Sequence, residues 1–482
     1  MAVRGSVAWM AFGQGSLFLV QLIGSVIVAR LLGPFDMGIF AVAMAAVGII
    51  GVLQTVGLGS FLIRERELTP EVVATASSVN VVICLIMAAT IAIVGWLGAA
   101  LFREPGVRDV LLVIAVVPII GHFAFVPQTM LQRDGNFRTS ALITAGSSAT
   151  GLIITVWLAA HGYRYMSLAY SQVATAVLTN TAVNIVGRRY INMRWSLTHW
   201  SRVAQFGAQI FAIGGLNAVA SRTMELVLGK VLGLAALGVF TRASSNHGQI
   251  WGSVHGVVNS VIFVDFARYR REGRPLDARY LQVLELMTGL MWPLFGGVAV
   301  LAGPLVWLVY GHAWLAAATP LALLCVASIL LVSTTMTWEL FVIFEETARQ
   351  VRLEVIRTLL GTVLFVIACF YSLAAVAAAR VIEAAFAQWL YRPHIERLTG
   401  ASRAGFHRVY RRSGAATAVA VLPALAVMSY HRFSPFVPVE QVAAAVAAGG
   451  LLWLLTLRRL QHPVYGELTT LLRRVRRIGV PA

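Results

Sequence analysis

The stretch ARLLGPFDMGIF, at residues 29–40, decides the fold because a close copy of its pattern returns two hundred residues later. Residues 32–33 (LG) and 38–40 (GIF) match residues 232–233 (LG) and 238–240 (GVF) at the same spacing. Each copy joins two apolar runs, and glycine permits the tight reversal between them. The match predicts an internal repeat, and repeats in membrane transporters usually face each other across the substrate path.

The composition indicates an integral membrane protein. The 482 residues are 59% hydrophobic and only 12% charged, with a mean hydropathy of +0.79. A water-soluble fold of this length does not tolerate such an apolar composition. The net charge of +18 does not point to a nucleic-acid partner, since base-reading motifs are absent and the arginines flank apolar runs.

Apolar runs of suitable length predict an all-α polytopic fold with about fourteen transmembrane helices. Six helices separate the two copies of the repeat, so we expect two six-helix lobes related by a parallel repeat, followed by two C-terminal helices. The predicted spans are 6–30, 39–62, 74–101, 109–131, 138–160, 165–187, 204–229, 238–264, 281–310, 315–343, 353–374, 376–391, 414–430 and 440–457.

Alternate connections between these runs carry most of the 38 Lys and Arg residues. The bias of positive charge toward the inner side therefore predicts that both termini are cytoplasmic. The expected divisions are an N-terminal lobe (1–187), a cytoplasmic linker (188–203), a C-terminal lobe (204–391), a basic inner loop with two extra helices (392–457) and a basic cytoplasmic tail (458–482). Apolar and basic residues of the tail alternate at helical spacing, which is typical of a helix on anionic membrane lipids; a solvated basic tail is the alternative.

Polar residues concentrate in the first, seventh and eighth predicted spans, and such residues tend to face a bundle interior or a hydrated cavity. Because arginine and amide side chains favour anions, we expect this cavity to bind an anionic substrate. The candidate substrate-binding residues are Arg30, Arg222, Arg242, Gln21, Asn217, Asn246 and Gln249, and the candidate for ion coupling is Glu225.

Two arginines of the predicted spans have an acid three residues later, the spacing at which side chains pair on one helix face. These pairs are Arg222 with Glu225 and Arg380 with Glu383. The alternative to a binding role is that each pair merely neutralises buried charge. Arg242 has no acid within its own helical turn, which makes it the stronger ligand candidate.

No motif for catalysis or metal binding is found. His247 and His255 lie eight residues apart, without the spacing of metal ligands, and the HExxH, GxSxG and GxxxxGK[ST] patterns do not occur. The three cysteines show no disulfide framework. We therefore expect a protein that is not an enzyme and uses no cofactor or metal.

Three segments carry a resemblance to a known group: ARLLGPFDMGIF (29–40), GLGSFLIRERELTPE (57–71) and PQTMLQRDGNFR (127–138). The chain resembles the oligosaccharide flippases of the multidrug/oligosaccharidyl-lipid/polysaccharide exporter superfamily, especially the exopolysaccharide branch. The resemblance implies alternating access and a cationic central cavity, in which Arg30, Arg222 and Arg242 occupy suitable positions.

The resemblance also implies a substrate, a location and partners. The substrate is an undecaprenyl-pyrophosphate-linked repeat unit, flipped from the inner to the outer leaflet of the bacterial inner membrane for exopolysaccharide or O-antigen synthesis. The implied partners are a polysaccharide polymerase and export machinery. Two transport functions remain as alternatives, namely a cation-coupled multidrug exporter of the same superfamily and a flippase for a lipid-linked peptidoglycan precursor.

Overall fold

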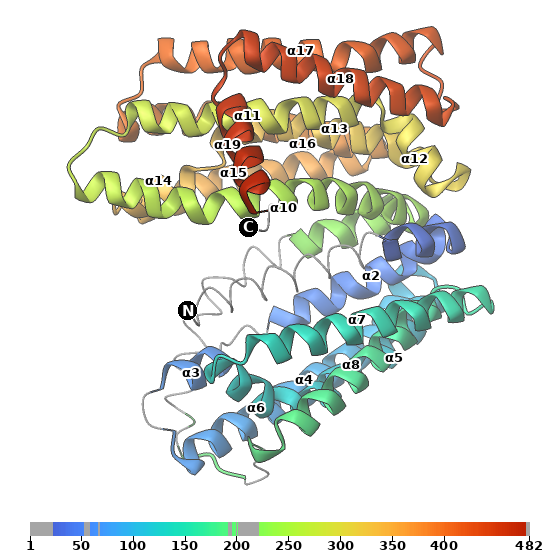
Figure 1. Cartoon of the computed structure of the whole chain (residues 1–482). Helices are drawn as coiled ribbons and strands as arrows, with labels where there is room; N and C mark the ends of the chain where they lie inside the picture. The colour runs from blue at the N-terminus through green and yellow to red at the C-terminus, as the bar shows by residue number, and fades with distance from the viewer. Residues whose placement is uncertain are drawn as a thin grey trace. The chain divides into compact units, whose positions relative to one another are not determined.

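The computed structural model describes residues 23–52, 58–65, 68–190, 195–198, 200 and 221–478, with the backbone alone at 253–261 and 471–478. The described part contains helices and 3-10 turns and no strand. The chain divides into two compact units, residues 1–238 and 239–482 (Figure 1). The domain boundaries expected from helix counting stay a prediction.

The described part of the first unit begins with helical residues 23–31 and also contains helical residues 221–231. Between them the expected span 39–62 divides into two helices, and so does the expected span 109–131. The elements are α2 (Pro34–Ile50), α3 (Leu58–Arg64), α4 (Pro70–Phe102), α5 (Pro105–Ile114), α6 (Val116–Arg133), α7 (Phe137–Ala160), α8 (Met166–Val186) and η2 (Arg188–Tyr190).

The second unit contains most of α10 and everything after it. The expected spans 353–374 and 376–391 correspond to two separate helices, joined by a three-residue turn at 370–372. The elements are α10 (Leu234–Arg271), α11 (Asp277–Val300), α12 (Ala302–Tyr310), η3 (His312–Ala317), α13 (Ala318–Leu331), η4 (Val332–Thr334), α14 (Thr337–Ile343), α15 (Thr347–Cys369), α16 (Leu373–Thr399), α17 (Arg403–Tyr430), α18 (Val439–Arg459) and α19 (Pro463–Ile478).

Local sequence fixes where many of these helices begin. Thr69 and Ser402 are N-caps whose side chains accept hydrogen bonds from Val72 N and Gly405 N, at 3.3 and 3.1 Å. Such caps satisfy amide groups that the first helical turn leaves without partners. Prolines at the first helical positions of α2, α4 and α5 supply a preset φ angle.

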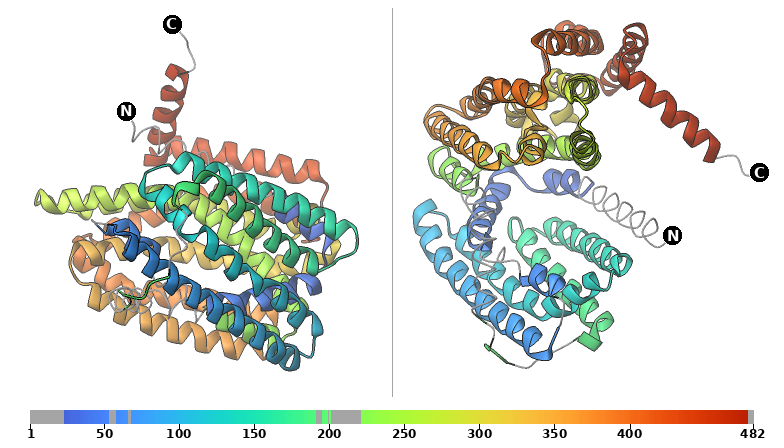
Figure 2. Two further views of the ribbon diagram at one scale, coloured as in Figure 1. Left: turned by 90° about the horizontal axis from the view of Figure 1, so that it is seen from below. Right: turned by 90° about the vertical axis from the view of Figure 1, so that its left-hand side faces the viewer.

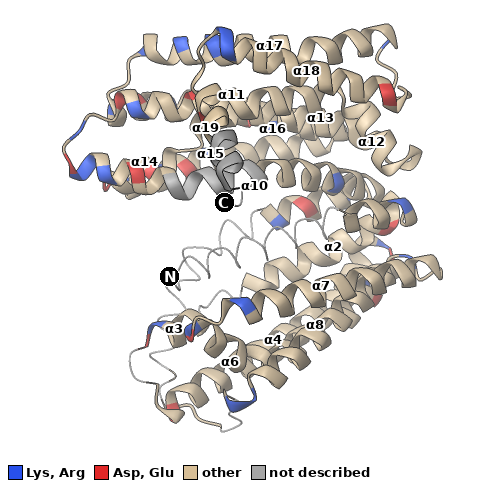
Figure 3. Ribbon diagram, in the orientation of Figure 1, with Lys and Arg blue, Asp and Glu red and all other residues tan. Residues whose placement is uncertain are grey.

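Eight helices among the described residues are long and apolar enough to cross a membrane. The helices α8, α10 and α15 are also long enough but more polar. Figure 3 shows that most charged residues lie near helix ends, with long uncharged stretches between them. The prediction of an all-α polytopic membrane protein is confirmed, whereas the number of fourteen spans stays a prediction.

The two copies of the repeated motif contact each other within the first unit. A Cβ atom placed on Gly38 of α2 would lie 1.9 Å from the carbonyl oxygen of Leu234, and one on Gly238 would lie 2.0 Å from that of Pro34. The contact is reciprocal, as in a two-fold arrangement, because Pro34 and Leu234 are equivalent positions of the repeat. Glycine is needed at both positions so that the two backbones can approach this closely.

The other two segments that carry the family resemblance pack on each other. Leu58, Phe61 and Leu62 of α3 form a buried apolar cluster with residues of α4 and with Val126 and Met130 of α6. Arg133, at the end of α6, donates hydrogen bonds to three carbonyl groups at the end of α3, those of residues 62, 63 and 65. The arginine thereby satisfies groups that a helix end leaves unpaired.

Candidate functional site

Arg222 and Glu225, on the helix formed by residues 221–231, make the ion pair expected from their spacing. Arg222 Nη1 lies 3.1 Å from each of the two Glu225 carboxylate oxygens. The side chains are 44% and 26% exposed, so the pair remains accessible to an incoming anion or cation. Both the pairing and the accessibility allow the roles assigned to these residues from sequence.

Gly48 of α2 makes room for the Arg222 side chain. A Cβ atom at position 48 would lie 2.8 Å from Arg222 Nε and 3.1 Å from its Cδ. The sequence did not indicate this residue, because a glycine inside an apolar span does not show which side chain of another helix packs against it. Gly48 therefore contributes to the candidate site by its lack of a side chain.

We expect Gly48→Ala to lower transport severalfold while leaving the amount of folded protein unchanged. The added methyl group meets the far end of a flexible side chain, so the Arg222 guanidinium moves while the helices keep their packing. Polymer export and protein level in the membrane provide the two measurements. Gly51→Ala is the matched control, since nothing lies within 4 Å of a Cβ at that position; equal export from both variants would contradict this role of Gly48.

Arg242 of α10 is buried, with a relative exposure of only 6%, and its guanidinium faces two aromatic rings. The guanidinium carbon lies 5.3 Å from the ring centroid of Tyr310 and 5.3 Å from that of Trp314. Both are within the range of a cation–π interaction. The Tyr310 hydroxyl donates a 2.7 Å hydrogen bond to Asn246 Oδ1. Tyr310, which the sequence did not indicate, therefore connects Arg242 with Asn246, two of the predicted site residues.

The Arg242 side chain differs from that of Arg222 because it has no acid partner among the described residues. No carboxylate of the described residues is paired with the Arg242 guanidinium, and its buried Nε has no hydrogen-bond partner among them. The absence of an acid agrees with its selection as a ligand candidate. In the described conformation, however, Tyr310 and Trp314 cover it.

The remaining predicted residues are distributed along both units. Arg30 is exposed at the end of the helix formed by residues 23–31, and Gln249 is half-buried on α10. Gln21 and Asn217 lie outside the described residues. Arg30, Arg222 and Glu225 belong to the first unit, and Arg242, Asn246 and Gln249 belong to the second.

The second expected ion pair, Arg380 with Glu383 on α16, is also formed. It belongs to a larger network, because Arg357 of α15 donates to Glu383 at 2.7 Å and also binds Glu354. Tyr391 of α16 donates a 2.7 Å hydrogen bond to Glu354. The sequence predicted one pair, whereas the fold assembles two arginines, two glutamates and a tyrosine.

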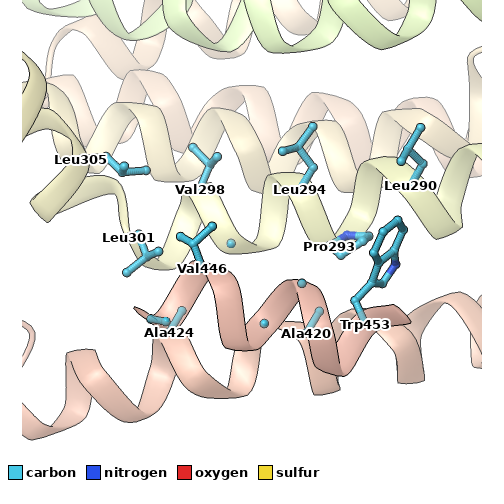
Figure 4. A pocket seen from close by; sticks show the side chains of 14 residues that line it. Leu290, Pro293, Leu294, Val298, Leu301, Leu305, Ala420, Ala424, Val446 and Trp453 are labelled. Carbon is cyan, nitrogen blue, oxygen red and sulfur yellow. The ribbon is translucent and has the colours of Figure 1, made fainter. Parts of the chain in front are cut away.

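An apolar groove of about 330 Å³ lies between α11, α17 and α18 in the second unit (Figure 4). Leu294 and Val298 of α11, together with Leu301 just after it, form one wall, and Val446 and Trp453 of α18 lie opposite. Gly449 of α18 allows this helix to approach α17, since a Cβ there would lie 2.5 Å from the Ala420 carbonyl oxygen. The groove offers space to an apolar chain.

The arrangement of helices defines the class of protein by comparison with solved structures. The chain superposes on the lipid II flippase MurJ in an inward closed conformation with a TM-score of 0.75 and 15% identity, covering 94% of this chain and 99% of that one. An inward-facing multidrug resistance MATE family transporter of the MOP superfamily gives a TM-score of 0.54 and 17% identity, covering 80% and 96%. The protein therefore has the multi-pass membrane fold shared by these transporters.

The sequence places the chain within a family of this class. Residues 27–319 match the family described as "Polysaccharide biosynthesis protein", which is more than half of the chain, and the chain belongs to this family. The succinoglycan biosynthesis transport protein ExoT of Rhizobium meliloti is 23% identical over 325 residues, covering 67% of this chain and 66% of that relative. The lipopolysaccharide biosynthesis protein WzxC of Escherichia coli is 20% identical over 329 residues, with the same two shares. The resemblance noted from the three segments is confirmed.

Proposed function

We propose that this protein flips undecaprenyl-pyrophosphate-linked oligosaccharide repeat units from the inner to the outer leaflet of the bacterial inner membrane, by alternating access, for exopolysaccharide or O-antigen synthesis. Membership of the polysaccharide biosynthesis protein family, with a succinoglycan transport protein among its relatives, carries the proposal. The fold supports it, because a lipid II flippase shares that fold over nearly the whole chain.

The substrate headgroup determines what the protein has to supply. A pyrophosphate charge cannot enter hydrocarbon unaided, since transfer of a bare ion there costs tens of kcal/mol. We assign its binding to Arg30, Arg222 and Arg242 together with the amides Gln21, Asn217, Asn246 and Gln249. The exposed guanidinium of Arg222 is the contact with the strongest geometric support, because it is accessible and oriented by Glu225.

Glu225 is the candidate for ion coupling. A pyrophosphate that binds Nη1 of Arg222 displaces the Glu225 carboxylate, which then becomes free to bind a proton or a sodium ion. The membrane potential also favours outward movement of negative charge, by about 2.3 kcal/mol per charge per 100 mV.

The prenyl chain needs an apolar surface that remains continuous with lipid during transport. The groove between α11, α17 and α18 is lined almost entirely by aliphatic side chains and Trp453, which suits a polyisoprenoid. The remaining parts of the proposal are cytoplasmic termini, a polysaccharide polymerase and export machinery as partners, and no enzymatic activity, cofactor or nucleic-acid partner.

Two other transport functions are tested against this one. The fold shared with MurJ favours a flippase for a lipid-linked peptidoglycan precursor as the second candidate, and rescue of cells lacking such a flippase would establish it. A multidrug exporter of cationic compounds needs carboxylates free to bind them. The carboxylates of Glu225 and Glu383 are instead paired with arginines, so we rank that function third.

We expect Arg222→Ala to lower polymer export 10- to 100-fold and to leave lipid-linked repeat units in the inner leaflet. Loss of a hydrogen bond to a charged group accounts for a change of this size. Export and leaflet distribution are measured in cells with equal levels of protein. Arg108→Ala is the control, because Arg108 forms a partly exposed pair with its neighbour Asp109; normal export from Arg222→Ala would remove Arg222 from the proposed site.

A further inference from the structure

Arg380 lies on the buried face of α16, although one third of its side chain is exposed. Val376, Glu383 and Tyr391 are buried on that face, and since successive residues are 100° apart around a helix, Arg380 lies between Val376 and Tyr391 on the same face. The opposite face carries Ile382 and Trp389, which are 55% and 70% exposed. The exposed 34% of Arg380 therefore faces space on the inner side of the helix and not the lipid-facing surface.

Arg380 is held in place by a buried carboxylate. Its Nη1 lies 2.5 Å from Glu383 Oε2, while the other oxygen of Glu383 accepts from Arg357 Nη1 at 2.7 Å. The Glu383 side chain is only 6% exposed and fits against Gly361 of α15, where a Cβ would lie 2.6 Å from its Cδ. Because both oxygens of Glu383 are used, the carboxylate fixes the position of the guanidinium.

The guanidinium of Arg380 has nitrogen atoms that form no hydrogen bond with the described residues. Within the part of the chain whose side chains the structure describes, only Nη1 is hydrogen-bonded, and Nε and Nη2 have no partner. By contrast, Arg357 uses Nε and both Nη atoms on Glu354 and Glu383. A partly exposed arginine whose Nε and Nη2 are both free matches the geometry with which guanidinium binds phosphate oxygens.

We propose that Arg380 is a second anion-binding position and that it contacts a phosphate-type oxyanion, the pyrophosphate of the lipid-linked substrate. This inference rests on the proposed function for the identity of the anion. Glu383 holds the guanidinium and competes with the bound anion, because a carboxylate and a phosphate repel each other across one arginine. Arg357, Glu354, Tyr391 and the nearby His247 of α10 are the other titratable groups around this position.

The test measures binding of inorganic pyrophosphate to the purified full-length protein in phosphatidylcholine nanodiscs by calorimetry. All variants carry Arg222→Ala, so that the most accessible of the other candidate contacts does not contribute. We expect Arg380→Gln to weaken binding 10- to 100-fold. Glu383→Gln is expected to strengthen it about fivefold, since it removes the competing charge. A merely structural role of Glu383 does not predict this gain.

Arg349→Gln is the matched control, because it removes one positive charge at a more exposed position. Arg349 lies on α15, as Arg357 does, and pairs with Glu346. Thermal unfolding of each variant verifies that it is folded. If Arg380→Gln does not fold, Arg380→Lys replaces it, and the loss expected is severalfold because one charge remains without the two free donors. Two outcomes overturn the proposal. One is unchanged affinity of the Arg380 variant, and the other is no detectable pyrophosphate binding by the parent protein that carries Arg222→Ala alone.

A second arm distinguishes the substrate headgroup from an ordinary membrane phosphate. The titration is repeated in nanodiscs that contain phosphatidylglycerol. Unchanged affinity supports assignment to the substrate, whereas a tenfold loss assigns the position to a lipid phosphodiester and overturns the proposal. Export by cells carrying Arg222→Ala reports on the proposed function separately, so the two proposals can fail independently.

Discussion

Gly38→Ala is expected to destabilise the protein by about 3 kcal/mol, since overpacking at a tight contact costs 1–3 kcal/mol and here the neighbour is backbone. The new Cβ would lie 1.9 Å from the Leu234 carbonyl oxygen and 2.5 Å from its carbonyl carbon. A side chain can rotate away from such a contact, but two helix backbones have to separate. We expect a strong decrease in folded protein, measured as membrane protein level and as the unfolding midpoint in mixed micelles.

The repeat supplies both a second test and a control. Gly238→Ala is expected to behave in the same way, because its Cβ would lie 2.0 Å from the Pro34 carbonyl oxygen. Gly33→Ala is expected to be tolerated, since Gly33 has an ordinary φ of −75° and nothing lies within 4 Å of a Cβ there. If Gly38→Ala proved as stable as Gly33→Ala, the close contact between the two motifs would be wrong.

Arg357→Met has the second largest expected effect, a loss of about 3 kcal/mol in the free energy of unfolding. Breaking a buried ion pair by removing one partner costs 3–5 kcal/mol, because the other charge stays buried without compensation. Arg357 serves two carboxylates, and Glu383 is 6% exposed, so the remaining Arg380 has to neutralise the network alone. Unfolding in mixed micelles provides the measurement.

Removal of the corresponding acid distinguishes a charge effect from lost packing. Adding Glu354→Gln to Arg357→Met restores neutrality, and we expect it to recover part of the lost stability. Arg349→Met is the control, since pairs as exposed as Arg349 with Glu346 contribute 0–1 kcal/mol. Equal effects of Arg357→Met and Arg349→Met would show that the network does not stabilise the second unit.

The candidate site was predictable where its contacts are local. The pairs Arg222 with Glu225 and Arg380 with Glu383 follow from a spacing of three residues on one helix, and both are formed. Gly48, Tyr310 and Arg357 were not predictable, because their partners lie on other helices. Sequence spacing reports neighbours within a helix and carries no information on which faces of separate helices meet.

The segments that carry the family resemblance also have a role that the sequence did not show. Residues 57–71 and 127–138 contribute to one apolar cluster, and Arg133 pairs with the carbonyl groups at the end of α3. Their contacts are those of packing and helix capping. The family likeness in these two segments therefore reports how the first unit is held together, and the candidate binding residues lie elsewhere.

The sequence by itself determined the membrane class, the repeat and the family, because apolar length, a matched glycine pattern and loop motifs are properties of the chain read in order. Tertiary structure alone decided that the two repeat motifs touch at Gly38 and Gly238, that Tyr310 and Trp314 cover Arg242, and that Arg357 joins Glu383. In a membrane, apolar faces pack with little preference for one neighbour. The choice of neighbour falls to close backbone contacts and to the few polar groups that require a partner.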